Sequence, residues 1–474
     1  MKIAKKLLKA LMWLALAIAG LIIAFYLVVL GINWRDQPPS EDALRLMKLS
    51  ASRPLVADQD NAYVYLMGFT VEPAQDPRAW GLQRIAWAQE QLKKSPNAFI
   101  APKDLPGKDH DFKAQRPREL QALIETCNKA VDAKCLKALD SGQTTLAAWL
   151  ASEQWLLERY RALLAHPAWS ETLPFQINTP LPPYQNAAEG QKLLLAQAWQ
   201  LAGQGNAAGV KKLLTEDIRF WRQNLAASDM LIGKMIATKA LQRHFTWANL
   251  VLRRLPPALM AHGIPEQWLV PLSDAERSLL RSLAGELTAS DSILKQTWEN
   301  GATALGMIEA NWTLNSSLFD PLLKPLLQRQ ASSNKYAEQF AASDAALQVP
   351  YAQYPAAVEH ARVMGEKDRD DSLFTFFIKR LYNPVGELLF SIGSFDPIEY
   401  AVRVSDVEGL RRATLLTTEL RSQGVTSGQL AQKLAEATAR NPYTGQPFVW
   451  DDSAKAVVFT GLERGERGRH ALLY

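Results

Sequence analysis

The pattern of apolar and polar residues separates one uninterrupted apolar stretch from a long series of amphipathic segments. Residues 10–32 read ALMWLALAIAGLIIAFYLVVLGI and contain no charged side chain. With a rise of about 1.5 Å per residue, a helix of this length measures roughly 34 Å, which exceeds the hydrocarbon core of a bilayer at about 30 Å. The sequence therefore predicts a transmembrane helix at residues 10–32, in direct contact with membrane lipid.

A cleavable signal peptide is the alternative, because Ala17 and Ala19 form an A-x-A pattern after a basic start. Cleavage after Ala19 would leave a strongly apolar new N-terminus. The stretch is also longer than the roughly 7–15 residues of a signal-peptide core. An uncleaved signal anchor is therefore favoured. No cysteine lies near the stretch, so lipidation of a mature N-terminal cysteine is excluded.

The charges that flank the apolar stretch predict its orientation. Four lysines and no acidic residue precede it: Lys2, Lys5, Lys6 and Lys9. Because positive flanks stay in the cytoplasm, we expect residues 1–9 to be cytoplasmic and the bulk of the chain to be periplasmic or otherwise extracytoplasmic, at the inner membrane. Trp34 follows the stretch and suits the headgroup level, where an amphipathic ring is stable.

Beyond residue 32, apolar residues recur at spacings of three and four, which is typical of amphipathic helices. Residues suited to helix N-termini precede several of these segments: Ser40, Asp60 or Asn61, Pro77, and Ser273 with Glu276. Helix is also expected to return at about residue 118. The other helices that we expect are 40–50, 62–69, 77–94, 143–165, 186–204, 207–228, 230–255, 273–298, 318–330, 334–347, 354–364, 373–382, 406–424 and 427–440.

Residues 186–228 are predicted to form a helical hairpin, with a turn at Gly203, Gly205 and Asn206. This hairpin resembles a tetratricopeptide-type unit of roughly 34 residues. No second copy lies in register, so an irregular α-α hairpin array is expected. Near the C-terminus, the segments FVW and AVVFT flank the polar DDSAK as a small β-hairpin would. The predicted fold class is all-α, with an N-terminal transmembrane helix and a small C-terminal β-hairpin and turn segment.

The domain organisation follows from these elements. The C-terminal layout and the upstream segment NPVGELLFSIG are similar to those of uncharacterised, membrane-anchored, mostly helical envelope proteins of bacteria, a resemblance that implies location and fold but no activity. The expected parts are a cytoplasmic tail (1–9), the anchor (10–32), a membrane-proximal helical region with a long loop (33–117), a helical ectodomain (118–440) and a turn-rich end (441–474).

Composition and charge narrow the class of protein. A hydrophobic content of 48% is ample for a packed core. The formal net charge is +5, but the four N-terminal lysines supply +4, so the exported part carries 5 − 4 = +1. The sequence pI of about 9.0 therefore reflects the membrane flank. A basic surface is the main sequence argument for nucleic-acid binding, and the nearly neutral exported part does not provide one.

Cys127 and Cys135 are eight residues apart and are the two cysteines of the chain. On one uninterrupted helix their Cα atoms would lie about 12 Å apart, too far for a disulfide. We expect a turn between them and a local disulfide, because the predicted compartment is oxidising. Two buried free thiols are the alternative. A metal site is disfavoured, since no histidine or further cysteine lies at ligand spacing.

Motifs with known chemistry are missing from the sequence. There is no HExxH, GxSxG or glycine-rich phosphate loop, so no catalytic, cofactor-binding or metal-binding residue is assigned. His110 stands between two aspartates, and His360 lies near Glu359 and Glu366, but exposed charged segments explain both. Most of the fourteen tryptophans fall on apolar helix faces.

Two groups of residues remain as candidates. Asp217, Arg222 and Lys234 lie on consecutive predicted helices and could form an interhelical polar network, although Lys234 reaching solvent along its methylene stem is the favoured alternative. Tyr443 and Trp450 lie in the terminal turn segment, which we expect to line a ligand or partner surface if the protein has one.

Two functions are consistent with the sequence. The first is a non-enzymatic, single-pass membrane-anchored scaffold or binding protein whose partner is another envelope protein or a cell-wall component. The second is a membrane-tethered hydrolase or lipid-handling enzyme with a noncontiguous active site. A redox role for the cysteines is weaker, because their spacing is not Cys-x-x-Cys. No cofactor is expected.

Overall fold

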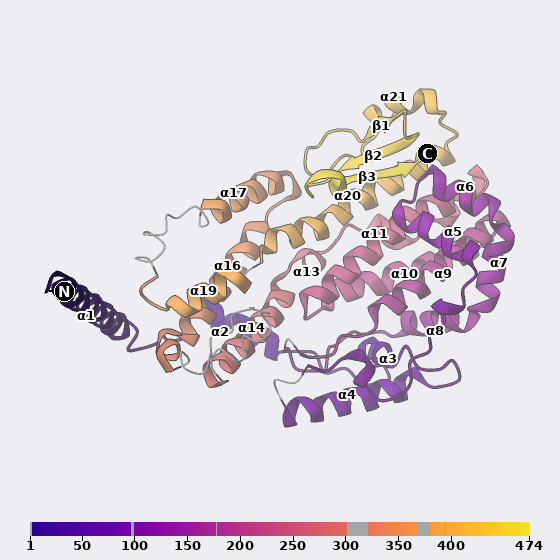
Figure 1. Ribbon diagram of the computed structural model, residues 1–474. Helices are drawn as coiled ribbons and strands as arrows, with labels where there is room; N and C mark the ends of the chain where they lie inside the picture. The colour runs from indigo at the N-terminus through magenta and orange to yellow at the C-terminus, as the bar shows by residue number, and fades with distance from the viewer. Residues whose placement is uncertain (1, 96–98, 177, 301–320, 368–379, 394) are drawn as a thin grey trace.

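A computed structural model describes residues 2–95, 99–176, 178–300, 321–367, 380–393 and 395–474. The described residues are mostly α-helical, with a small three-stranded antiparallel sheet near the C-terminus and one apolar N-terminal helix, which confirms the predicted fold class (Figure 1). The helix α1 (Lys2–Ile32) projects from one end of an elongated body. Over Lys6–Ile32 it is long and apolar enough to cross a membrane.

The helices of the body pack as irregular hairpins. They are α2 (Glu41–Ala51), α3 (Ala62–Met67), α4 (Pro77–Lys94), α5 (Arg118–Lys129), α6 (Ala133–Ser141), α7 (Gln143–Ser152), α8 (Gln154–Ala165), α9 (Tyr184–Gly203), α10 (Ala207–Ala227), α11 (Leu231–Arg254), α12 (Pro257–Met260), α13 (Asp274–Arg277), α14 (Leu280–Asn300), α16 (Arg329–Leu347), α17 (Tyr354–Lys367), α19 (Pro384–Gly393), α20 (Pro397–Ser422) and α21 (Leu430–Glu436). The strands are β1 (Val449–Asp451), β2 (Ala456–Thr460) and β3 (Arg469–Leu473).

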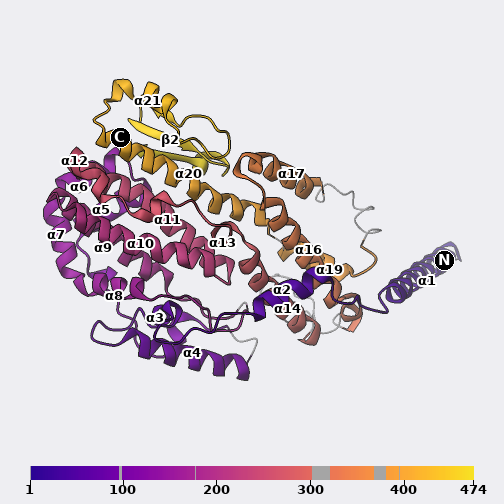
Figure 2. The ribbon, with the colours of Figure 1, turned by 180° about the vertical axis from the view of Figure 1, so that it is seen from behind.

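The core of the body is built on α9, α10, α11 and α20. The helix α11 packs against α9 and α10 on one side and against α20 on another. Most apolar residues of α11 are buried, and Trp199 on α9 and Trp221 on α10 are among the largest buried side chains. Towards α1, the helices α2, α14 and α16 pack together, and both views show them between this core and α1 (Figures 1 and 2).

The C-terminal sheet lies on α20 and on the end of α11. Residues Val449–Asp451 pair antiparallel with β2, so the predicted hairpin is present. A third strand, which the sequence did not predict, pairs with the other edge of β2. Gly409 on α20 lies against the ring of Phe459, which leaves no space for a side chain at residue 409.

Several predicted caps are present in the structure. Ser40 accepts from the backbone N–H of Ala43, and Asn61 caps α3 in the same way. The helix α4 has the predicted bounds, with Pro77 in its first turn. Ser273 and Glu276 form the predicted capping box.

Two predicted helices are broken by buried carboxylates. The segment 143–165 divides at Glu153, whose side chain pairs with Arg116 at 2.6 and 2.7 Å. The segment 273–298 divides after Arg277, because the carboxylate of Asp344 accepts from the hydroxyl of Ser278 and from the backbone of the next residue. Helix α20 starts at Pro397, nine residues before the predicted start at residue 406. The predicted helix 373–382 and the start of 318–330 lie largely outside the described residues.

Helices α3 and α4 approach each other through two glycines. A Cβ atom at Gly81 would lie 1.9 Å from the carbonyl oxygen of Val64, and one at Gly68 would lie 1.9 Å from that of Pro77. Both obstacles are backbone atoms, which cannot rotate away. The two helices therefore require glycine at both positions.

We predict that Gly81→Ala destabilises the protein by about 1–3 kcal/mol or more, because α3 and α4 have to move apart. Thermal unfolding followed by circular dichroism measures the effect. Gly428→Ala is the matched control, since nothing lies within 4 Å of its added methyl group. Equal unfolding temperatures for the two variants would contradict this packing.

Candidate functional site

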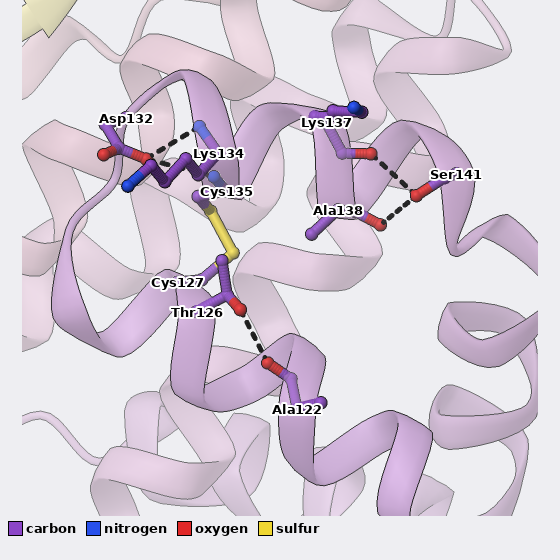
Figure 3. Close-up of a disulfide and its surroundings, with 9 residues drawn as sticks. All are labelled: Ala122, Thr126, Cys127, Asp132, Lys134, Cys135, Lys137, Ala138 and Ser141. Atoms are coloured by element: carbon purple, nitrogen blue, oxygen red, sulfur yellow. Dashed lines mark hydrogen bonds between the residues drawn. A yellow bond between two sulfur atoms is a disulfide. The ribbon is translucent and has the colours of Figure 1, made fainter.

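The two cysteines form the predicted disulfide (Figure 3). Helix α5 ends at Lys129, and Asp132 caps α6 by accepting from the backbone N–H groups of Lys134 and Cys135. This turn brings the two Cα atoms to 4.7 Å, in place of the roughly 12 Å that one straight helix would impose. Both sulfur-bearing residues are buried.

The structure contradicts the expectation that Tyr443 lines a surface. Its side chain is 4% exposed, and its hydroxyl donates to the carboxylate of Asp406 at 2.8 Å. That carboxylate also accepts from the backbone of Leu462 and Glu463, so it fastens the terminal segment to α20. Burial raises the pKa of Asp406 to about 6. Tyr443 is therefore a core residue.

Trp450 remains at the surface of the sheet. It is half-buried, and its ring packs edge-on against Tyr474 with centroids 6.1 Å apart. The neighbouring Val449 is 62% exposed. The apolar edge of the sheet at Val449 is therefore accessible for contact.

Asp217 is the centre of a buried polar network, although its partners differ from the predicted ones. It is 0% exposed and accepts from Tyr160 at 2.7 Å, while His244 Nδ1 lies 2.8 Å from its second oxygen. Gln191 donates to the same carboxylate at 3.0 Å. The other ring nitrogen of His244 accepts from the indole N–H of Trp268. This network joins α8, α9, α10 and α11.

Arg222 and Lys234 lie apart from Asp217, so the three predicted residues do not form one network. The guanidinium of Arg222 forms a bidentate ion pair with the carboxylate of Glu276, with hydrogen bonds of 2.5 and 2.9 Å. Lys234 is 2% exposed, and its ammonium donates to the carbonyl of Leu225 at 2.7 Å. The favoured interpretation, a lysine that reaches solvent, is therefore wrong. Burial lowers the pKa of Lys234 to about 7, against the attraction of Glu276 and Asp344.

The two histidines with acidic neighbours have protein partners or solvent around them. His110 Nδ1 lies 2.8 Å from Glu72, and Asp109 pairs with Arg84 at 2.7 Å. His360 is exposed on α17. Among the described residues, no group of three His, Cys, Asp or Glu side chains lies close enough to hold a metal ion.

Glu171 and Asp229 form a pair of buried carboxyl groups that the sequence did not indicate. Each accepts from the backbone N–H of the other. Burial and the charge of Asp229 raise the pKa of Glu171 to about 8. Burial also raises the pKa of Asp229, although Arg281 pairs with it at 2.7 Å. These residues are 58 positions apart in sequence and lie outside the main helix faces, so no spacing could have indicated the pair.

The carboxyl pair is closed to substrates in this structure. A Cβ atom added at Gly233 would lie 3.3 Å from Glu171, 3.1 Å from the hydroxyl of Tyr184 and 3.2 Å from that of Ser228. Glu171 is 6% exposed and Asp229 is 2% exposed, so a substrate would reach these two titratable groups only after a local opening of the packing.

A half-open hollow of about 390 Å³ lies on the surface between α7, α8 and α9. Its lining residues are Leu150, Ala151, Gln154, Leu157, Glu158, Arg161, Gln197 and Gln200. The side-chain oxygen of Gln197 is buried and has no hydrogen-bond partner among the described residues. This mixture of leucine and polar side chains suits a polar partner with an apolar part.

The junction between α1 and the body is a buried polar cluster. Asn33 donates to the carbonyl of Leu381 at 2.7 Å and accepts from the backbone of Asn383 at 2.6 Å, while Gln328 donates to the carbonyl of Asn33 at 2.7 Å. Asp36 then accepts from two backbone N–H groups in the first turn of α16. The exposed fractions of Asn33, Gln328 and Asn383 are 5%, 6% and 3%. The end of α1 is therefore fixed to the body.

We predict that Lys234→Met makes the protein more stable at neutral and acidic pH. The pKa of Lys234 in the folded protein lies below its unfolded value of about 10.5, so its contribution to stability is complete above that value and is lost as pH falls through about 7. The variant should gain about 1–3 kcal/mol at pH 6, after the cost of leaving the carbonyl of Leu225 unpaired. The gain should vanish near pH 10.

Unfolding temperatures measured from pH 6 to pH 10 test this expectation. Lys212→Met, at an exposed position on α10, is the matched control and should show no such dependence. A constant difference between Lys234→Met and the native protein across this range would contradict the interpretation of Lys234 as a buried lysine.

Comparisons with protein-family models, with curated proteins and with solved structures found no match to this chain. Its function is therefore argued from the geometry described above.

Proposed function

We propose that the protein is a single-pass membrane-anchored helical ectodomain that acts as a non-enzymatic scaffold or binding protein of the cell envelope. The observation that carries this proposal is the contrast along α1. Its apolar side chains are exposed over most of its length, Leu21 at 70% for example, whereas Asn33 at its end is 5% exposed and bonded to the body. A bilayer is the environment that such a helix requires.

The orientation of the anchor is argued from charge and from the disulfide. The four lysines before the apolar stretch favour a cytoplasmic N-terminus. The Cys127–Cys135 bond favours an oxidising compartment for the body. Both arguments support an inner-membrane protein whose body lies on the extracytoplasmic side.

The contrast between polar side chains bonded inside the body and those that line the surface hollow supports a binding role. Asp217, Arg222 and Lys234 are all engaged by protein partners inside the body, where they fix the packing of helices. In the hollow between α7, α8 and α9, by contrast, the buried side-chain oxygen of Gln197 has no hydrogen-bond partner among the described residues. We infer that this hollow binds the partner, which is another envelope protein or a cell-wall component.

The alternative function is a membrane-tethered hydrolase or lipid-handling enzyme. The raised pKa values of Glu171 and Asp229 favour it, because a carboxyl group that titrates near neutral pH can act as a general acid. An enzyme would need an opening at Gly233, where the packing is tight. The binding role therefore fits the geometry better.

Membrane topology is the first test of the proposal. We predict that a cysteine introduced as Leu55→Cys reacts with a membrane-impermeant maleimide in intact cells, because Leu55 is fully exposed on the body. Lys6→Cys, at the other end of the anchor, should react only after permeabilisation. The reverse pattern would place the body in the cytoplasm and would contradict the proposal.

The hollow is tested by photo-crosslinking in cells. We predict that a photoreactive amino acid in place of Gln154, which lines the hollow, gives a crosslinked product of defined mass. The same amino acid in place of Gln432, an exposed residue of α21, is the matched control. Absence of any reproducible product that is specific to residue 154 would count against a partner in the hollow.

A further inference from the structure

The body touches α1 below the outer end of the predicted span. The hydroxyl of Tyr26 donates to the carbonyl oxygen of Leu322 at 2.8 Å. Tyr26 lies six residues before Ile32, the last residue of α1, which corresponds to about 9 Å along the helix axis. The segment that contains Leu322 therefore lies beside the anchor and not above it.

The direction of the tyrosine side chain places the contact deeper still. In an α-helix the Cα–Cβ bonds tilt towards the N-terminus, which in α1 points into the membrane. The hydroxyl that contacts the carbonyl of Leu322 therefore lies on the membrane side of the Tyr26 Cα atom. A carbonyl at this depth needs a hydrogen-bond donor, because lipid provides none, and the tyrosine hydroxyl supplies it.

The side chains around this contact suit lipid. Leu322 is 48% exposed and Leu323 is 42% exposed, whereas the next leucines in the chain, Leu326 and Leu327, are buried in the body. Trp298 at the end of α14 is 44% exposed, and the ammonium of Lys324 lies 4.5 Å from its ring centroid. Leucines with an adjacent tryptophan and lysine are typical of an element at the boundary between headgroups and acyl chains.

The junction makes this depth a fixed property of the molecule. Gln328, directly after Leu327, donates to the backbone carbonyl of Asn33, and the side chain of Asn33 accepts from the backbone of Asn383. Leu322 cannot move away from the bilayer unless these buried hydrogen bonds break. The exposed leucines thus continue the apolar surface of the anchor. The occupant of this surface is the outer leaflet that surrounds α1.

We propose that Leu322 and Leu323 insert into the outer leaflet next to α1, with Trp298 and Lys324 at the headgroup level, as a second lipid contact that sets the body at a defined tilt. This inference rests on the proposed membrane span. The two leucines would form a lipid contact that does not cross the membrane, in addition to the transmembrane helix. The end of the body that carries α14 and α16 would then face the membrane (Figures 1 and 2).

Depth-dependent quenching on the full chain in lipid nanodiscs tests the proposal. Single cysteines are introduced by Leu322→Cys and Leu323→Cys and labelled with an environment-sensitive dye, while the native cysteines stay paired. Leu55→Cys and Leu269→Cys are matched controls, since both are exposed leucines of the body. Leu21→Cys, in the middle of the predicted span, reports on the span itself.

Dyes at 322 and 323 should shift to shorter wavelength and lose most of their emission to a nitroxide near the top of the acyl chains, and dyes at 55 and 269 should not. Quenching at 322 and 323 no greater than at 55, with strong quenching at 21, would overturn the insertion and leave the span intact. Absence of quenching at 21 would overturn the span and the insertion together.

Discussion

The hydrogen bonds of Asn33 decide how the two physically different parts of this protein are joined. On one side of this residue lies a helix whose surface is almost entirely apolar and exposed, and on the other lies a body with an ordinary packed core. A flexible linker would leave the body free to turn relative to α1. Here the buried side-chain amide of Asn33 bonds to the backbones of Leu381 and Asn383, and Gln328 donates to the backbone carbonyl of Asn33, so the end of α1 is held on the body.

The helical fold was predictable because its signals are local. Apolar spacing, caps and prolines determine most helix starts, and α4 has the expected bounds at both ends. The errors occur where a distant residue replaces the local signal. The predicted helix 143–165 breaks at Glu153, which pairs with Arg116. The carboxylate of Asp344 accepts from the backbone N–H of Leu279, 65 residues away in sequence, at the start of α14. No window of the sequence contains both partners.

The environments of the candidate site residues were even harder to predict, because their partners are not visible in the local sequence. Tyr443 stands in a turn-rich segment, which is usually exposed, but the carboxylate of Asp406 draws its hydroxyl into the core. Lys234 was expected to reach solvent, yet the carbonyl of Leu225 provides a partner that a sequence cannot reveal. The disulfide was predicted because the spacing of its cysteines and the expected compartment were both visible in the chain. Polar residues are hard to place since their partners come from several helices.

The local character of the disulfide has a consequence for biogenesis. Both cysteines are buried, and the helices α5 and α6 that carry them lie at the end of the body opposite to α1 (Figure 1). Oxidants reach such buried thiols poorly once the core has closed. The bond, however, spans only eight residues and needs no other part of the chain. In the proposed topology, the bond can therefore close as soon as residue 135 reaches the extracytoplasmic side, before the remaining residues have been exported.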